Sequence, residues 1–476
     1  MLEKLFRVSE RGSTVGRELR GGLVTFVTMS YIIVLNPLIL GSFSPEGPGA
    51  KKDVLGHVLA VPQVAAVTAL AAGVMTLVFG LVANLPFALA TGLGINVLVA
   101  ATLAPMMTWP EAMGLVVIDG LIIVLLAASG LRTAVFNAVP PSLKAAIAVG
   151  IGLFIAFIGL VDSGFVRRIP DAAGTTVPVE LGSGNSIATW PTFVFVIGLL
   201  VTGLLVARQV RAGILIGVVI TTVVAIVVEA FVHVGSSATN PAGWSLSVPA
   251  LPSSIVGLPD LSLVGAFSFG AFSRLDIITV VLLVFTLVLA NFFDAMGTMT
   301  GLGKQAGLVD ENGQLPNVGR ALIVEGTGAV VGGAVSSSSN TVFVESASGI
   351  AEGARTGLAN VLTGVLFLLA MFLTPLYAIV PIEAAAPALV IVGALMIRQI
   401  TEIDFTDFRI GLPAFLTIVV MPFTYSIANG IGAGFVSYVV LAAGTGRART
   451  VHPLMWVVAV AFLAYFAVVP LRTLLA

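Results

Sequence analysis

Four acidic residues lie within long apolar stretches of the sequence. Asp294 belongs to the phrase LANFFDAMGTMTG and Glu345 to NTVFVESASG, whereas Asp119 and Glu325 sit near the middle of two further apolar stretches. If these stretches cross a bilayer, keeping a carboxyl there costs about 3 kcal/mol or more. Acidic residues that persist at such a depth commonly bind a ligand, exchange a proton or pair with a partner.

We interpret Asp294 and Glu345 as two carboxylates that face one polar cavity. They could accept hydrogen bonds from the N–H groups of a neutral heterocycle, and at least one could exchange a proton because burial disfavours a charged carboxyl. The alternative is a structural carboxyl bound to a helix N-terminus or to a Ser or Thr hydroxyl. We favour that alternative for Asp119 and Glu325, because each lies on an unbroken helix without a polar cluster. No lysine or arginine is expected at a depth that would pair with any of the four.

Two apolar segments are interrupted, and Glu345 lies on one of them. Residues 86–102 (PFALATGLGINVLVAAT) contain a proline and two glycines, and residues 336–353 (SSSSNTVFVESASGIAEG) are too polar to face lipid. Both are expected to be an extended stretch that leads into a short helix. Non-helical backbone is tolerated at membrane depth only where it is buried in protein or lines a cavity, and paired broken segments indicate a transporter's substrate site.

The starts of the two short helices would present unpaired N–H groups near the membrane midplane. Such ends can receive a polar substrate group. The alternative is that the small residues merely allow helices to pack closely. The residues expected to form the two ends are Thr91, Gly92, Gly94 and Asn96 in the first segment, and Asn340, Thr341, Val344 and Glu345 in the second.

The composition requires a membrane around these segments. Hydrophobic residues make up 58% of the 476 residues and charged residues 9%, against roughly 25% charged in soluble domains. Apolar runs of about 20 residues, enough to cross a bilayer, recur from residue 22 to residue 470. We therefore predict an all-α polytopic membrane protein with about 14 transmembrane segments. The status of the final run, 452–470, is left open.

The positions of the broken segments predict an internal repeat. Residues 86–102 form the third segment of the first half, and residues 336–353 form the third segment of the second half. A repeat of seven segments must be inverted in the membrane, because seven is odd. With a cytoplasmic N-terminus, most of the 22 lysine and arginine residues fall on the cytoplasmic side, as the positive-inside rule requires.

Other functional classes lack their signatures. The chain has no cysteine, and its three histidines lie in or beside predicted loops. No nucleotide-binding P-loop, zinc signature or serine–histidine triad is present, which argues against a primary pump and against an enzyme. The net charge of −1 gives no general attraction for nucleic acid.

Several phrases together carry a family resemblance. The sequence resembles the AzgA-like branch of the nucleobase/ascorbate transporter family, the hypoxanthine–adenine–guanine permeases, over nearly the whole chain to about residue 450. The phrases are GGLVTFVTMSYIIVLNPLIL, NLPFALATGLGINV, PPSLKAAIAVGIGLFIAFIGL, NFFDAMGTMTGLGKQAGLVDENGQLPNVGRAL and FVESASGIAEGARTGL.

The resemblance implies an architecture and a site. It implies a core domain (1–134 and 276–380) and a gate domain (135–275 and 381–476), short strands in segments 3 and 10, and often a homodimer. The acidic residue of the family's segment 8 motif corresponds to Asp294, three before Gly297, and Thr298 follows that glycine. The acidic residue of segment 10 corresponds to Glu345, and the segment 3 asparagine to Asn96.

The sequence departs from the family pattern at two places. Many AzgA-like members have a second aspartate three residues before the first, where this chain has Asn291. The pocket would therefore carry one fewer titratable group, which affects proton stoichiometry. The Ser-rich run 336–339 also differs from the Gly-Thr-Ser phrase of that loop.

We therefore expect an integral protein of the plasma (inner) membrane that imports purine nucleobases with protons, or with sodium, and that needs no cofactor. Glu345 would bind the base, aided by backbone groups near Thr91, Gly92 and Val344. Asp294 would carry the proton, with Thr298 and Asn291 as hydrogen-bond partners. An anion (sulfate-like) transporter of the same architecture and a passive channel are the alternatives.

Overall fold

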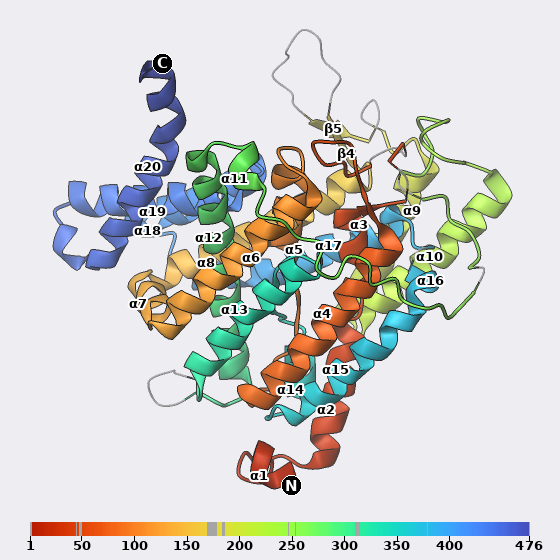
Figure 1. Ribbon diagram of the computed structural model, residues 1–476, viewed down its shortest axis with the longest axis horizontal. Coiled ribbons are helices and arrows are strands. Elements are labelled where there is room, and N and C mark those ends of the chain that lie inside the picture. Colours follow the sequence, from red (N-terminus) through yellow and green to blue (C-terminus); the bar gives the residue numbers. More distant parts are fainter. Residues whose placement is uncertain are drawn as a thin grey trace.

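Apolar helices make up most of the molecule (Figure 1). The computed structural model describes residues 2–43, 45–46, 50–168, 179–182, 186–245, 247–252, 254–309, 315–377 and 379–475. Within those residues, 10 helical stretches are long and apolar enough to cross a membrane. They are Val15–Leu40 (α2, Val15–Met29, and α3, Ile32–Leu40), α4 (Val61–Val82), α6 (Trp109–Ala128), α8 (Pro141–Asp162), α9 (Trp190–Ala207), α10 (Gly213–Val232), Ile277–Ala295 of α12 (Ile277–Gln305), Leu358–Tyr377 (α15, Leu358–Ala370, η2, Met371–Leu373, and α16, Thr374–Tyr377), Ile382–Glu402 (α17, Ile382–Met396, and η3, Ile397–Glu402) and α19 (Ile427–Gly444).

The remaining elements are shorter or lie at the ends of these helices. The other apolar helices are α13 (Val318–Ala334), α18 (Phe408–Phe423) and α20 (Pro453–Leu475), and the short ones are α1 (Leu2–Phe6), α7 (Leu131–Ala138), α11 (Ala271–Arg274) and η4 (Ala448–Thr450). Four short strands pair outside the central region: β1 (Gly41–Ser42) with β2 (Leu59–Ala60), and β4 (Val166–Arg168) with β5 (Val179–Leu181). The elements follow the predicted apolar runs in order along the whole chain.

Both interrupted segments have the expected strand-then-helix form. In the first, β3 (Leu89–Thr91) leads into α5 (Leu93–Leu98) and the π-helical turn η1 (Val99–Leu103). In the second, β6 (Asn340–Val342) leads into α14 (Ser346–Ala351). The two strands pair antiparallel, with Ala90 opposite Thr341. Two segments 250 residues apart in the sequence therefore meet at the centre of the fold.

Neighbouring side chains satisfy the backbone groups that this two-stranded sheet leaves free. The Thr76 hydroxyl on α4 accepts from the Leu89 N–H at 2.9 Å and donates to the Leu89 carbonyl at 3.0 Å. The Ser346 hydroxyl accepts from the Ala88 N–H at 3.0 Å, and the Asn360 amide on α15 donates to the Phe87 carbonyl at 2.7 Å. Such partners are what allow non-helical backbone to persist at membrane depth.

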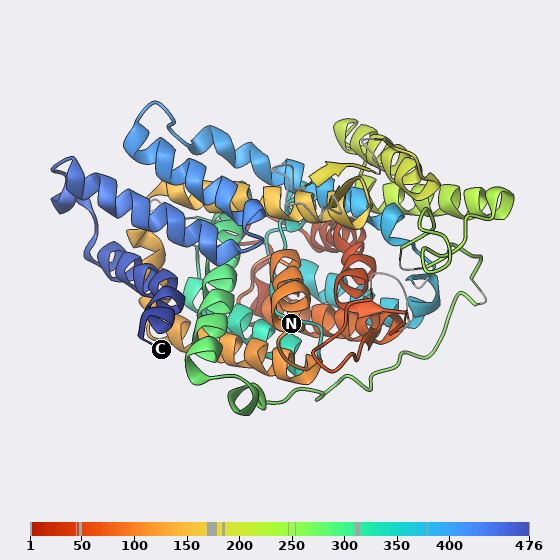
Figure 2. The same ribbon diagram turned by 90° about the horizontal axis from the view of Figure 1, so that it is seen from above.

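The helices pack in two groups. One group contains α2, α3, α4, α6, α12, α13 and α15 together with both interrupted segments, and the other contains α8, α9, α10, α17, α18 and α19. Figure 2 shows helices α8, α9, α10, α17, α18 and α19 of the second group along one side of the molecule, with the first group on the other side. Contacts between the groups are made mainly where α5, α12 and α3 meet α8, α17 and α19.

Two further segments lie at the periphery. The connection from 254 to 276 runs across the ends of the first group, where the Gly257 N–H donates to the Phe372 carbonyl and the Gly265 N–H to the Ala334 carbonyl. Helix α20 projects at the edge of the molecule (Figure 1) and packs on α19 and α7. Its Phe462 ring lies 6.0 Å from that of Phe435 on α19. Whether α20 spans the membrane stays open.

Candidate functional site

A cavity of about 280 Å³ lies between the two helix groups. This volume is close to the lower limit of about 300 Å³ for pockets that hold small molecules. The first group contributes the interrupted segments and α12, and the second contributes α8, α17 and α19. Most of the wall is apolar, and the apolar side chains include Leu93, Ile95, Ile147, Ile151, Ile155, Phe293, Val342, Phe343, Val392, Met396 and Ile427.

Asp294 and Glu345 both line this one cavity. Asp294 comes from α12, and Glu345 is the residue that precedes α14. The two acidic residues are 51 positions apart in the sequence, and the antiparallel pairing of β3 with β6 brings the second interrupted segment beside α12. The shared cavity is the arrangement on which the carboxylate pair interpretation depends.

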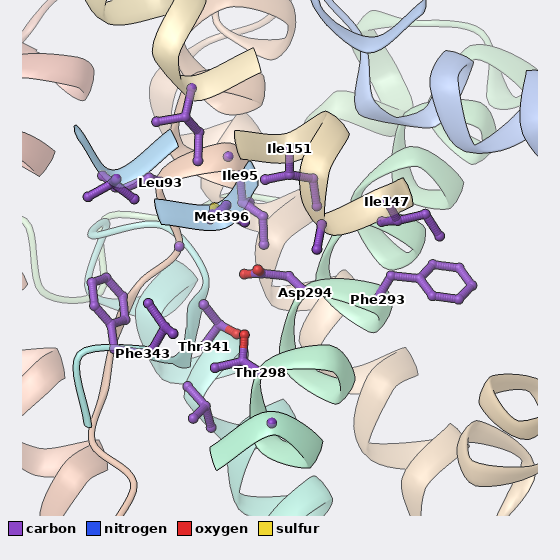
Figure 3. Close-up of a pocket in the computed structure, with 18 of the residues that line it drawn as sticks. Leu93, Ile95, Ile147, Ile151, Phe293, Asp294, Thr298, Thr341, Phe343 and Met396 are labelled. Atoms are coloured by element: carbon purple, nitrogen blue, oxygen red, sulfur yellow. The ribbon is translucent and has the colours of Figure 1, made fainter. Parts of the chain in front are cut away.

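Asp294 faces the first interrupted segment. Its Oδ2 lies 3.6 Å from the position that a Cβ on Gly92 would occupy, and the same Cβ would meet Thr341 Cγ2 at 3.0 Å. A larger residue in place of Gly92 would therefore crowd both the strand pair and the carboxylate. Asp294, Thr298 and Thr341 present their polar atoms to the same part of the cavity (Figure 3).

Glu345 is held by a tyrosine that the sequence interpretation did not identify. The Tyr31 hydroxyl donates to Glu345 Oε1 at 2.5 Å, and Tyr31 also lines the cavity. Tyr31 lies at the break between α2 and α3, at the N-cap of α3. Its polar hydroxyl within the apolar phrase MSYIIVLNP was the signal that could have identified it.

The other predicted site residues divide into two sets. Gly92, Val344 and Thr298 line the cavity. Thr91, Asn96 and Asn340 are fully buried and are not part of its wall. The Asn96 amide donates to the Thr91 hydroxyl at 3.2 Å and the Asn340 amide to the Gly328 carbonyl at 3.1 Å, so both asparagines support the interrupted segments from behind.

Asn291 does not pair with Asp294, and the predicted partnership is wrong. The Asn291 Nδ2 donates to Asp119 Oδ2 on α6 at 3.0 Å, in a fully buried site. Asn291 precedes Asp294 by less than one helical turn, so a pattern of neighbouring polar residues suggested a shared face. Packing instead turns Asn291 toward α6 and Asp294 toward the cavity.

The expectation that no basic residue reaches the buried carboxyls is also wrong. Arg132 Nη1 lies 2.5 Å from Glu325 Oε2, and both side chains are 0% exposed. Arg132 belongs to the short helix α7, which lies between the predicted apolar runs, and its guanidinium lies 5.6 Å from the centre of the Phe292 ring. Asp119 and Glu325 thus lie in a polar cluster and not on isolated helix faces.

Several further cavity residues were not predicted. Phe343 and the isoleucines of α5 and α8 give the cavity an apolar wall (Figure 3). Lys144, Gln305 and Gln399 line it at the ends of α8, α12 and η3. Nothing in the spacing of these residues distinguished them from lipid-facing or loop positions.

Comparison with known proteins identifies the family to which these features belong. A model described as a permease family, that of the xanthine/uracil permeases, matches residues 16–433. The chain belongs to the xanthine/uracil permease family. As a member, it is an integral, multi-pass membrane permease and not an enzyme.

Relatives of this permease align over nearly their full length. The guanine/hypoxanthine permease PbuG of Bacillus subtilis is 37% identical over 473 residues, which cover 98% of this chain and 99% of the relative. The adenine permease AdeP of Escherichia coli is 34% identical over 472 residues, covering 97% and 95%. These alignments include both interrupted segments and α12.

Solved structures show the fold of the permease in more distant proteins. The transmembrane domain of a cyanobacterium bicarbonate transporter, BicA, superposes with a TM-score of 0.59 at 15% identity, covering 88% of this chain and 97% of that chain. SLC26A9 superposes with a TM-score of 0.58 at 13% identity, covering 90% and 65%. Both likenesses concern the all-helical polytopic fold alone.

Proposed function

We propose that this permease imports purine nucleobases such as hypoxanthine, guanine or adenine together with protons. The observation that carries the proposal is the single cavity that holds both Asp294 and Glu345 between the two helix groups. Membership of the xanthine/uracil permease family and the names of PbuG and AdeP supply the substrate class.

The cavity has the chemistry that a planar, neutral base requires. Glu345, oriented by Tyr31, accepts hydrogen bonds from the ring and exocyclic N–H groups. Backbone groups near Gly92 and Val344 bind the remaining polar edge. The Phe343 ring and the α5 and α8 isoleucines contact the faces of the base, where burial of apolar surface favours binding.

Asp294 is the proposed coupling carboxylate. Asp294 lies on α12 with Thr298 and Thr341 beside it (Figure 3). It lines the cavity that a bound base would fill. A carboxyl in a site that alternates between hydrated and closed states gains a proton when the charged form is disfavoured. Binding of the base and binding of the proton then favour the same closed arrangement.

We propose 14 segments in two inverted halves, with the first helix group as the core domain and the second as the gate domain. Separate packing within each group supports a movement of one group against the other. With a cytoplasmic N-terminus, the ends of α8, α12 and η3 that carry Lys144, Gln305 and Gln399 face the cytoplasm. The cavity would then open inward, in a protein of the plasma (inner) membrane.

Uptake of a panel of labelled bases tests this proposal directly. Cells or vesicles that lack other purine permeases should accumulate labelled hypoxanthine, guanine or adenine in a saturable manner when the protein is present. An inward proton gradient should raise accumulation, and an uncoupler should abolish it. Non-saturable entry, or entry that no gradient affects, would contradict the proposal.

Competition separates purine transport from the anion alternative. A tenfold excess of sulfate should leave hypoxanthine uptake unchanged, whereas unlabelled guanine should reduce it. Inhibition by sulfate together with sulfate uptake would support an anion transporter of the same architecture. The cavity's two carboxylates argue against that outcome, because like charge repels an anion.

A further inference from the structure

A second buried polar cluster lies where α12 packs against α6 and α7. It consists of Asp119 on α6, Asn291 on α12, Glu325 on α13 and Arg132 on α7, and all four side chains are fully buried. None of them lines the cavity. Two pairs of consecutive helices, α6 with α7 and α12 with α13, therefore converge on a site that the proposed binding of the base does not use.

The cluster holds more potential negative charge than positive charge. Glu325 is paired with Arg132, and Asp119 lies close enough to both of them for electrostatic interaction. With both carboxyls ionised, the sum is two negative charges and one positive charge, or −1. At the outer end of α6, Glu111 and Arg274 form their own ion pair, and Asp53 Oδ2 accepts from the Trp109 N–H. A buried unpaired charge is disfavoured so strongly that the group usually becomes neutral instead.

In the described residues, Glu325 Oε1 and Arg132 Nε and Nη2 lack hydrogen-bond partners as well, but these two side chains balance each other's charge. The unpartnered oxygens of Asp119 and Asn291 therefore indicate where the neutralising charge binds. Asp119 and Asn291 are already joined through Asn291 Nδ2 and Asp119 Oδ2. Among the residues that the structure describes, the remaining oxygen of each side chain, Oδ1 in both, has no hydrogen-bond donor. A protonated carboxyl has one O–H donor to offer. A proton on Asp119 would therefore remove the excess charge and give Asn291 Oδ1 its missing donor.

We propose that Asp119, paired with Asn291, is a second proton-binding site of this permease and that proton exchange there is part of the transport cycle. The inference rests on the proposed proton coupling. Glu325 connects the two sites, because it interacts electrostatically with Asp294 as well as with Asp119. The same buried negative charge therefore disfavours a second ionised carboxylate at either site.

Asp119→Asn tests the role with little disturbance of the fold. The new carboxamide can donate to Asn291 Oδ1 and so reproduces the protonated form. In reconstituted vesicles, exchange of labelled for unlabelled hypoxanthine at equal pH should stay within twofold of the wild type. Accumulation driven by an inward pH gradient should fall at least tenfold, and the number of protons that enter with each purine, measured with a pH-sensitive dye, should fall by one.

The matched control is Glu111→Gln, on the same helix but outside the cluster, which should keep full accumulation. Gradient-driven accumulation by Asp119→Asn at the wild-type level would overturn the inference and leave Asp119 a structural residue. Sodium-dependent accumulation by the wild type that this substitution abolishes would also overturn it, because the bound cation would then be sodium.

Asn291→Ala decides the question if Asp119→Asn fails to reach the membrane. The substitution removes a charge-assisted hydrogen bond from ionised Asp119 but only a weaker neutral one from protonated Asp119. Its proton should therefore be released at higher pH, and the pH midpoint of accumulation should rise by about one unit. An unchanged midpoint would overturn the inference. Failure of the wild type itself to respond to a pH gradient would instead reject the proposed proton coupling as a whole.

Discussion

The two polar regions to which α12 contributes use the same residue types in different surroundings. The cavity holds Asp294 and Glu345 and is open space lined by both helix groups, with a tyrosine as the hydrogen-bond donor. The buried cluster holds Asp119 and Glu325 within the first helix group, with an arginine and an asparagine as partners. A carboxyl that binds a ligand needs open space beside it. A carboxyl that is buried among packed helices needs a counter-charge or a proton instead.

Glu345→Gln, in the cavity, is expected to reduce purine uptake more than any substitution in the buried cluster. The substitution removes the negative charge and replaces one of the two acceptor oxygens with an NH2 group, so the Tyr31 hydroxyl and the base compete for the single oxygen that remains. Loss of charged hydrogen bonds of this kind should reduce hypoxanthine uptake by about 100-fold or more. The amount of protein in the membrane should not change, and Glu402→Gln, at an exposed position on η3, serves as the control. Near-normal uptake would remove Glu345 from the site.

Arg132→Leu should act on stability and not on recognition of the base. It leaves Glu325 buried without its counter-charge, which typically destabilises a protein by about 3–5 kcal/mol. The double substitution Arg132→Leu with Glu325→Leu should restore much of that loss, because two apolar residues need no partner. Thermal unfolding of the purified protein measures both. Equal stability of the single variant and the wild type would mean that this ion pair does not hold α7 against α13.

Tyr31→Phe tests whether the cavity depends on an oriented carboxylate. It removes one hydrogen bond to Glu345 and keeps the ring, so the loss should be about 1–1.5 kcal/mol, or about tenfold in uptake efficiency. The concentration for half-maximal uptake should rise while the protein stays as stable as before. A loss as large as that of Glu345→Gln would instead assign Tyr31 a direct contact with the base.

The smallest effect is expected at a surface ion pair. Asp407 lies before α18, and its hydrogen bonds with Arg409 hold the pKa of its carboxyl at about 2. Because that pKa is depressed, the contribution of the ion pair to stability is complete above the ordinary carboxyl value of about 4 and is lost as the pH falls from there toward 2. Asp407→Asn should therefore leave uptake and its pH profile between pH 5 and 8 unchanged, since exposed ion pairs contribute little. A shifted profile would indicate a role in coupling.

The sequence alone was sufficient for the membrane architecture. Runs of about 20 apolar residues predict helices because the bilayer leaves the backbone no other partner, and the structure has helices at nearly the same bounds. The interrupted stretches at 86–102 and 336–353 were recognisable for the same local reason. Proline, glycine and polar residues cannot continue a lipid-facing helix, so a strand and a short helix follow in each.

Only the tertiary structure decided which polar side chains meet. Asn291 and Asp294 share one helix, yet packing directs the first to Asp119 and the second to the cavity. Arg132 follows an apolar run in the sequence and is nevertheless wholly buried against Glu325, 193 positions away. Periodicity records which residues avoid water, but the partner of a polar group depends on which helices become neighbours, and that is determined by packing across the whole chain.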